Sequence, residues 1–226
     1  MSEALELDGV PMLFEDESVA WATRSLPRSQ SRSVAEARER RTRELAAGRA
    51  CADRALGSLG VEARVGEDRA PVWPAGFTGS ISHKGERCVA AAAPLGRILG
   101  IGIDLENGER LEDETFPWIF RAAEIGALRS LPAGTRGLFA SAAFSAKESI
   151  YKCVRPYSGR FLDFREVRID LDPERSLFRA SLPSDVARLL PEGSRVDGRM
   201  RVSGRWILTG ALLLRSIDGS RIASNT

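Results

Sequence analysis

Residues 79–106 read GSISHKGERCVAAAAPLGRILGIGIDLE, with two apolar runs on either side of a short turn-forming segment. The runs at 88–93 and 98–105 predict two buried strands, and the proline and glycine within 94–96 predict the turn that joins them.

Helical patterns lie on both sides of the two strands. Ser33 and Glu36 resemble a capping box at the start of an Ala-, Leu-, Glu- and Arg-rich run, so residues 34–59 predict a long helix, and residues 135–154 predict a second one. Further strands are predicted at 61–65, 166–171, 177–182 and 205–214, the last one after a turn at Ser203 and Gly204. Helix-rich and then strand-rich order occurs twice, which predicts an α+β protein of two similar halves, residues 1–104 and 105–226.

The charge of the chain is nearly balanced, with 33 basic and 31 acidic side chains and a net charge of +2. This balance argues against a protein that clamps nucleic acid by bulk charge. The basic residues are 30 arginines and only three lysines, beside a single histidine. With 43% hydrophobic residues, the chain is outside the range of disordered proteins and can bury a core.

Three cysteines, Cys51, Cys88 and Cys153, lie far apart in the chain, which argues against a disulfide framework or a structural zinc site. The acidic N-terminal segment does not resemble a secretory signal, and the apolar runs are too short to span a bilayer. The sequence predicts a cytoplasmic protein without a membrane segment.

The end of the second strand places two carboxylates together. Alternation along a strand directs Asp104 and Glu106 to one face, while Ile103 and Leu105 pack on the other. Two close carboxylates repel each other unless a cation neutralises them, and their hard oxygen ligands suit Mg²⁺. The alternative is an ordinary solvated strand end.

The segment FSAKESIYK, residues 144–152, contains two of the three lysines, Lys147 and Lys152, on either side of Glu148. In a chain so rich in arginine, this pattern favours a site that requires a compact ammonium group. The alternative is an ordinary surface pair between Glu148 and Lys152, which are i,i+4 neighbours.

The only histidine, His83, follows Ser82 and precedes Lys84 in GSISHK. Its role could be catalysis, a phosphate contact or a structural hydrogen bond. The sequence contains no G-x-S-x-G elbow, no Walker-type phosphate loop, and no dinucleotide-binding glycine pattern, since Gly100 and Gly102 lie inside a predicted strand. Hydrolase, P-loop and dinucleotide-binding functions are therefore disfavoured.

Four segments in this order resemble the 4′-phosphopantetheinyl transferase family of the surfactin/enterobactin type: RTRELAAGRACADRAL at 41–56, PVWPAGFTGSISHKG at 71–85, IGIDLE at 101–106 and FSAKESIYK. The resemblance extends from about residue 35 to 165. It implies Mg²⁺- or Mn²⁺-dependent transfer of the phosphopantetheine arm from coenzyme A to a serine of an acyl or peptidyl carrier protein, with release of adenosine 3′,5′-bisphosphate. It also implies a monomer of two α+β halves related by a pseudo-twofold axis, with coenzyme A in the cleft between them.

The resemblance also implies roles for individual residues. Asp104 and Glu106 match the metal-binding carboxylates, and Glu148 matches the third. Glu148 is the favoured base for the carrier serine, with Glu106 or a metal-bound water as alternatives. The residues that match coenzyme A contacts are Ser82, His83, Lys147, Lys152, Arg41, Arg49 and Arg69. Of these, Arg69 is displaced by one position from the basic residue of the family pattern.

The carrier partner implied by the resemblance is acidic. Residues 24–54 contain nine arginines against four acids, and residues 155–221 contain thirteen against nine, so these stretches offer a complementary surface. A non-catalytic module that binds coenzyme A or a nucleotide is the alternative function, and a nucleic-acid binder is disfavoured because aromatic residues do not interleave with the basic stretch at 24–54.

Overall fold

The structure is a computed structural model that describes residues 6–7, 10–11, 18–26, 33–61, 71–108, 111–172 and 174–216. Its strands are β1 (Glu6–Leu7), β2 (Val10–Pro11), β3 (Ala20–Ser25), β4 (Phe77–Lys84), β5 (Arg87–Pro94), β6 (Ile98–Glu106), β7 (Arg168–Asp172), β8 (Leu177–Ser181), β9 (Ser194–Ser203) and β10 (Trp206–Arg215). Its helices are α1 (Val34–Ser58), α2 (Phe116–Ile119), α3 (Ala122–Arg129), α4 (Ala133–Ser158) and α5 (Ser184–Ala187), with 3₁₀ turns η1 (Asp113–Thr115) and η2 (Phe164–Glu166).

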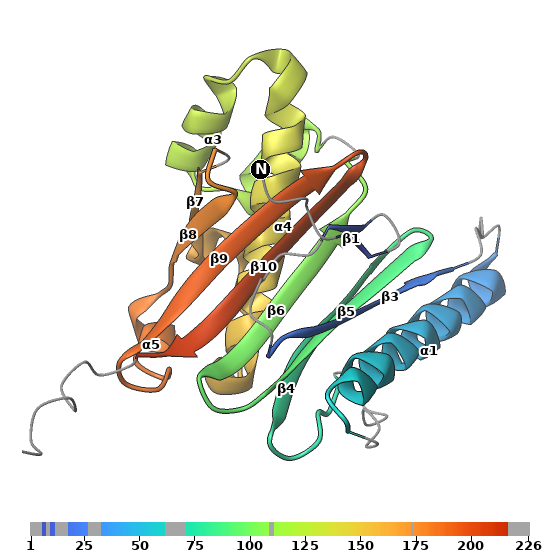
Figure 1. Ribbon diagram of the computed structural model, residues 1–226. Helices are drawn as coiled ribbons and strands as arrows, with labels where there is room; N and C mark the ends of the chain where they lie inside the picture. Colours follow the sequence, from blue (N-terminus) through green and yellow to red (C-terminus); the bar gives the residue numbers. More distant parts are fainter. Residues whose placement is uncertain are drawn as a thin grey trace, which may run out of the picture.

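The N-terminal half is a three-stranded antiparallel sheet, in the order β3-β5-β4, that is covered by α1 (Figure 1). The Ser33 side chain caps α1 by accepting a hydrogen bond from the backbone of Glu36, as the capping box predicts. Small side chains let the helix lie close to the sheet; they are Cys51, Ala52 and Ala55 on α1 and Cys88, Ala90 and Ala92 on β5.

The C-terminal half is a five-stranded antiparallel sheet, in the order β6-β10-β9-β8-β7, with α4 packed on one face (Figure 1). α4 ends at Gly159, which adopts the left-handed conformation with φ 63°. Alternate residues of β10 divide between two cores: Ile207 and Leu213 pack under α4, whereas Leu208 and Leu212 pack on the opposite face against the N-terminal half.

The two sheets meet along β4 and β6, which Figure 1 shows side by side. Two serine hydroxyls of β4 make this contact: Ser80 Oγ accepts a hydrogen bond from the Ile103 amide at 3.0 Å, and Ser82 Oγ accepts one from the Leu105 amide at 3.1 Å. We call this contact the β4–β6 junction. It places the end of β6 within reach of both halves of the molecule.

The predicted α+β class with two halves is confirmed. The expected division between residues 104 and 105 falls inside β6, whose whole length pairs with β10 in the C-terminal sheet. The topological boundary therefore lies before β6. The strand predicted at 61–65 lies almost entirely outside the described residues. Within the part of the chain that the structure describes, no helix combines the length and apolar character that a membrane crossing requires.

Candidate active site

Two glycines of β6 bring α4 unusually close to the sheet. A Cβ atom on Gly102 would lie 1.9 Å from the Ser149 carbonyl oxygen and 2.6 Å from the Cys153 nitrogen, and one on Gly100 would lie 2.8 Å from the Cys153 carbonyl oxygen. Only glycine permits these contacts. They align the face of β6 that carries Asp104 with the face of α4 that carries Lys152.

Asp104 is buried and accepts hydrogen bonds at both carboxylate oxygens. Its Oδ1 accepts from Ser82 Oγ at 3.0 Å and from Lys152 Nζ at 2.8 Å, and its Oδ2 accepts from Ser145 Oγ at 2.9 Å. Bonds from two elements, β4 and two different turns of α4, hold the carboxylate in one orientation. The strand alternation predicted for Asp104 is confirmed, since Ile103 and Leu105 lie in the core on the other face.

Sequence reasoning did not identify the hydroxyl groups beneath Asp104. Ser145 and Ser149, one turn apart on α4, lie 2.8 and 2.7 Å from the Thr209 hydroxyl of β10, and all three residues are fully buried. The i,i+4 spacing of the two serines on the helix was the available signal. This chain of hydroxyls satisfies polar groups that would otherwise be orphaned under the carboxylate.

Lys152 is the cation that the structure places at this carboxylate. Its ammonium donates to Asp104 Oδ1, to the Ile103 carbonyl oxygen at 3.1 Å and to Ser82 Oγ at 3.4 Å. Its side chain retains 27% exposure, so the ammonium is held at the edge of the site and not sealed within it.

Glu106 points to the same side of β6 and forms an ion pair with Lys84, whose role the sequence left unassigned; Lys84 Nζ and Glu106 Oε2 are 2.6 Å apart. Burial raises the pKa of Glu106; the hydrogen bond from Lys84 opposes this rise and the charge of Asp104 adds to it. Lys84 follows Ser80 and Ser82 at two-residue spacing on β4, which gives all three the same face.

Glu148 lies one turn before Lys152 on α4. Burial raises the pKa of its carboxyl group, the charge of Lys152 opposes this, and the charges of Asp104 and Glu106 raise it further. Glu148 therefore belongs electrostatically to the same group, and we call Asp104, Glu106 and Glu148 the acid cluster. Among the described residues, no three His, Cys, Asp or Glu side chains are already arranged to hold a metal ion.

His83 points away from the acid cluster because it follows Ser82 on the strand. Its Nε2 lies 3.2 Å from Glu44 Oε2 of α1. Arg41 is exposed and Arg49 is half-buried on the same helix, on either side of Glu44. The structure thus separates the predicted residues into two groups, the acid cluster and a histidine–arginine group of His83, Arg41 and Arg49. Ser82 and His83, which are adjacent on β4, connect the two groups. Arg69 lies outside the described residues.

Lys147 does not lie with the other predicted phosphate ligands. Its side chain is fully buried, and its ammonium donates to Glu124 Oε2 at 2.9 Å, to the Phe164 carbonyl at 2.9 Å and to the Val167 carbonyl at 2.6 Å. Burial lowers the pKa of this ammonium, and the bond to Glu124 opposes the change. An ammonium group has three protons, and all three are used here. The expectation that Lys147 holds a coenzyme A phosphate therefore does not fit its position.

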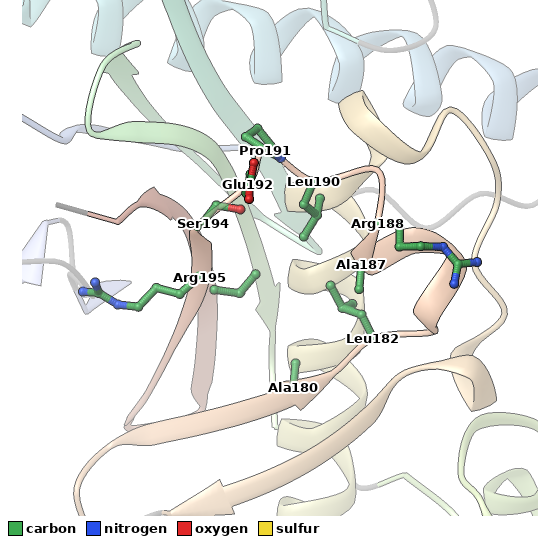
Figure 2. A pocket seen from close by; sticks show the side chains of 11 residues that line it. Ala180, Leu182, Ala187, Arg188, Leu190, Pro191, Glu192, Ser194 and Arg195 are labelled. Carbon is green, nitrogen blue, oxygen red and sulfur yellow. The ribbon is translucent and has the colours of Figure 1, made fainter. Parts of the chain in front are cut away.

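Three cavities in the C-terminal half do not include the acid cluster. The one in Figure 2, about 630 Å³, lies between β8, α5 and the start of β9, and its Arg188 and Arg195 extend to opposite sides of the view. A second, about 770 Å³, lies over β7, β8 and β9, and a third, about 380 Å³, lies between α3, α4 and β7. We place the candidate site at the acid cluster because convergent polar groups and shifted pKa values indicate chemistry better than cavity size does.

The acid cluster combines three carboxylates with two ammonium groups at an interface between two sheets. Such a site can bind a hard cation through the carboxylates and phosphate oxygens through the ammonium groups. It can also accept a proton at a carboxylate whose pKa is raised. These capacities together suit transfer of a phosphate-containing group.

Two family models match the chain. One, described as the 4′-phosphopantetheinyl transferase N-terminal domain, matches residues 29–93, and one described as the 4′-phosphopantetheinyl transferase superfamily matches residues 100–192. The two matches correspond to the two halves seen in the structure, and the gap between them contains the start of β6.

Similar proteins have the same description. The chain is 32% identical over 216 residues to the 4′-phosphopantetheinyl transferase Svp of Streptomyces mobaraensis, covering 93% of this chain and 80% of the relative. It is 30% identical over 190 residues to the 4′-phosphopantetheinyl transferase Npt of Nocardia iowensis, covering 81% and 85%. A solved structure of a holo-(acyl-carrier-protein) synthase from Bacillus anthracis, in complex with coenzyme A (3′,5′-ADP), matches 54% of this chain and 100% of its own with 21% identity and a TM-score of 0.42.

Proposed function

Because the chain belongs to the 4′-phosphopantetheinyl transferase superfamily, we propose that the acid cluster is the site at which it transfers the phosphopantetheine arm of coenzyme A to a serine of a carrier protein. The central supporting observation is the convergence of Asp104, Glu106 and Glu148 with Lys152 at the β4–β6 junction. Asp104 is fixed there by three hydrogen bonds, which suits a group that must hold a charged ligand in one geometry.

The reaction breaks the phosphoanhydride bond of coenzyme A and forms a phosphoester bond to the carrier. The serine oxygen of the carrier bonds to the phosphorus attached to the pantetheine arm, the bond from that phosphorus to adenosine 3′,5′-bisphosphate breaks, and the serine proton passes to a base. Negative charge develops on the leaving bisphosphate and on the oxygens around the phosphorus, so positioned cations are the main catalytic requirement.

Glu148 is our proposed base. Its raised pKa suits proton acceptance near neutral pH, and no described residue forms a hydrogen bond or ion pair with it. Glu106, the alternative, is engaged by Lys84 at 2.6 Å. Lys152 supplies an ammonium group that can turn from Asp104 to the leaving phosphate, since it is partly exposed.

The donor set of the acid cluster fits Mg²⁺ or Mn²⁺ in chemistry. Burial raises the pKa values of Glu106 and Glu148, and the charges of the neighbouring carboxylates raise them further, so a divalent cation would stabilise the charged form of these groups. We propose that Asp104, Glu106 and Glu148 hold this ion, with Lys84 competing for Glu106. When bound, the ion supplies positive charge that neutralises phosphate oxygens.

Coenzyme A contacts are proposed for Ser82, His83, Lys152, Arg41 and Arg49. Ser82 faces the acid cluster, while His83 faces α1, so β4 offers contacts on both of its faces. A ligand that lies across the end of this strand would reach both groups, with the diphosphate near Lys152 and the 3′-phosphate near the α1 arginines. Arg69 stays a prediction outside the described residues.

We propose that an acidic carrier docks against the arginine-rich surface. α1 exposes Arg38, Arg41 and Arg43, although the net charge of the chain is only +2. Reversal of Arg38 to glutamate should raise the KM for the carrier at low salt, and an unchanged KM there would exclude α1 as the docking surface. A monomeric state and a cytoplasmic location stay predictions, which sedimentation and cell fractionation test.

The experiment that tests the proposed function is mass spectrometry of an apo carrier protein incubated with coenzyme A, Mg²⁺ and this protein. We expect a gain of one phosphopantetheine group, lost in Asp104→Asn and Glu148→Gln but retained in the control Asp185→Asn, an exposed acid of the same half. No gain with several carrier types would overturn the function. A full gain with Asp104→Asn would overturn the site, and a full gain in EDTA would overturn the metal.

A further inference from the structure

The buried ammonium of Lys147, on α4, binds acceptors from three other segments of the chain. Its acceptors are Glu124 of α3, the Phe164 carbonyl of η2, and the Val167 carbonyl just before β7. The ring of Phe120 lies beneath the ammonium, 5.4 Å from its centroid. A fully buried cation with this number of partners is an ordered anchor and not a mobile surface group.

Glu124 extends the anchor beyond α4. Its Oε2 also accepts the Arg121 amide at 2.9 Å, which closes the first turn of α3, and its Oε1 accepts the Ile169 amide of β7 at 3.0 Å. One ion pair therefore fixes α3, β7 and α4 relative to each other. Removal of either partner would leave the other charge buried without compensation.

The anchor acts directly next to the acid cluster, because Glu148 follows Lys147 in the chain. Neighbouring residues of an α-helix project about 100° apart, and residues five apart project about 140° apart. When Lys147 is held against α3 and β7, the rotation of α4 about its axis is fixed, and Glu148 and Lys152 are directed to the side of Asp104.

We propose that Lys147 is a positioning residue, which acts through the Glu124 pair to hold Glu148 and Lys152 in register with Asp104 and does not contact coenzyme A. This inference rests on the proposed function. It replaces the phosphate-ligand role that the position of Lys147 in FSAKESIYK suggests.

The test compares kcat and the KM for coenzyme A at saturating carrier. We expect Lys147→Met and Glu124→Gln each to lower kcat by about tenfold or more with the KM for coenzyme A changed by less than about twofold, because misplacement of reacting groups affects the chemical step. The double variant should have a kcat no lower than that of Lys147→Met, since both substitutions remove the same bond.

The matched control is Arg136→Met. Arg136 anchors the same helix in the same manner, by donating to the Asp113 carboxylate and to the Arg129 and Leu131 carbonyls, but about three turns from Glu148. It should lower stability and leave kcat unchanged. If Lys147→Met does not fold, Glu124→Gln, which keeps the shape of the side chain, provides the readout.

Three results would overturn the inference and leave the proposed function intact. A KM for coenzyme A that rises strongly in Lys147→Met, with normal KM in Glu124→Gln, identifies Lys147 as a phosphate ligand. A normal kcat in folded Lys147→Met or Glu124→Gln would show that the anchor contributes to stability alone. An equal loss of kcat in Arg136→Met makes the effect a general one of α4 packing. A wild-type protein that modifies no carrier in the same assay would instead refute the proposed function, and the inference with it.

Discussion

Replacement of Gly102 by alanine would test how closely α4 must lie on β6. The added Cβ atom would lie 1.9 Å from the Ser149 carbonyl oxygen and 2.6 Å from the Cys153 nitrogen, and both are backbone atoms that no side-chain rotation can move. Cβ atoms essentially never approach other heavy atoms within 3.0 Å, so α4 has to retreat by roughly 1 Å.

Two consequences follow from this retreat. Overpacking of a well-packed core costs about 1–3 kcal/mol and more when backbone must move, so we expect a loss of at least about 3 kcal/mol in the free energy of unfolding. Ser145, Glu148 and Lys152 would move with the helix, and a displacement of about 1 Å at a catalytic group can lower the rate by about 100-fold. Urea unfolding and kcat/KM measured on the folded protein report the two effects separately.

A graded series of glycines provides the controls. Gly100→Ala, with its nearest backbone contact at 2.8 Å, should have a smaller effect than Gly102→Ala. Gly126→Ala in α3, where nothing lies within 4 Å, should stabilise the protein by about 0.5–1 kcal/mol through helix propensity. If Gly102→Ala matched the wild type in both stability and kcat/KM, the argument that close packing aligns the site would be refuted.

Four further substitutions test individual side chains. Ser80→Ala and Ser82→Ala should each cost about 1–3 kcal/mol, because each leaves a β6 amide without its acceptor; only Ser82→Ala should lower kcat, and equal losses of kcat would contradict the assignment of Asp104 to the site. Glu148→Gln should be more stable than the wild type at pH 7 in EDTA. Because folding raises the pKa of the Glu148 carboxyl, the wild-type protein loses stability as the pH rises above the unfolded pKa of this group, about 4.3. A stability difference between Glu148→Gln and the wild type that persists below about pH 4 would contradict this explanation. Thr209→Val should lower the urea midpoint by leaving the Ser145 and Ser149 hydroxyls short of a partner, and an unchanged midpoint would show that these serines find other partners.

The elements that sequence reasoning predicted are those with a strong local pattern. The runs at 34–59, 88–93, 98–105 and 135–154 correspond to α1, β5, β6 and α4, because apolar spacing and a capping box determine them locally. β9 was missed, since its arginines and glycine obscure the alternation of a strand whose residues are held by its neighbours β10 and β8.

The candidate site was predicted in composition but not in arrangement. Asp104 and Glu106 follow from strand alternation. Lys147 and Lys152 were both expected to bind coenzyme A phosphates. Residues five apart on a helix project about 140° apart, and accordingly Lys152 contacts Asp104 whereas Lys147 contacts Glu124. Ser82 and His83 were likewise joined, although neighbours on a strand face opposite sides. The partners Glu124 and Thr209 are distant in sequence, and only the tertiary structure brings them to the site.

The β4–β6 junction allows separation of the two halves to be measured at backbone amides, without a probe attached to a side chain. Amides along β6 alternate between its two edges, so those of Gly102 and Asp104 face β10, whereas those of Ile103 and Leu105 donate to serine hydroxyls of the other half. Separation of the halves would expose the second pair to solvent and leave the first pair protected. Hydrogen exchange at four successive residues of one strand can therefore distinguish the free energy of opening between the halves from that of global unfolding.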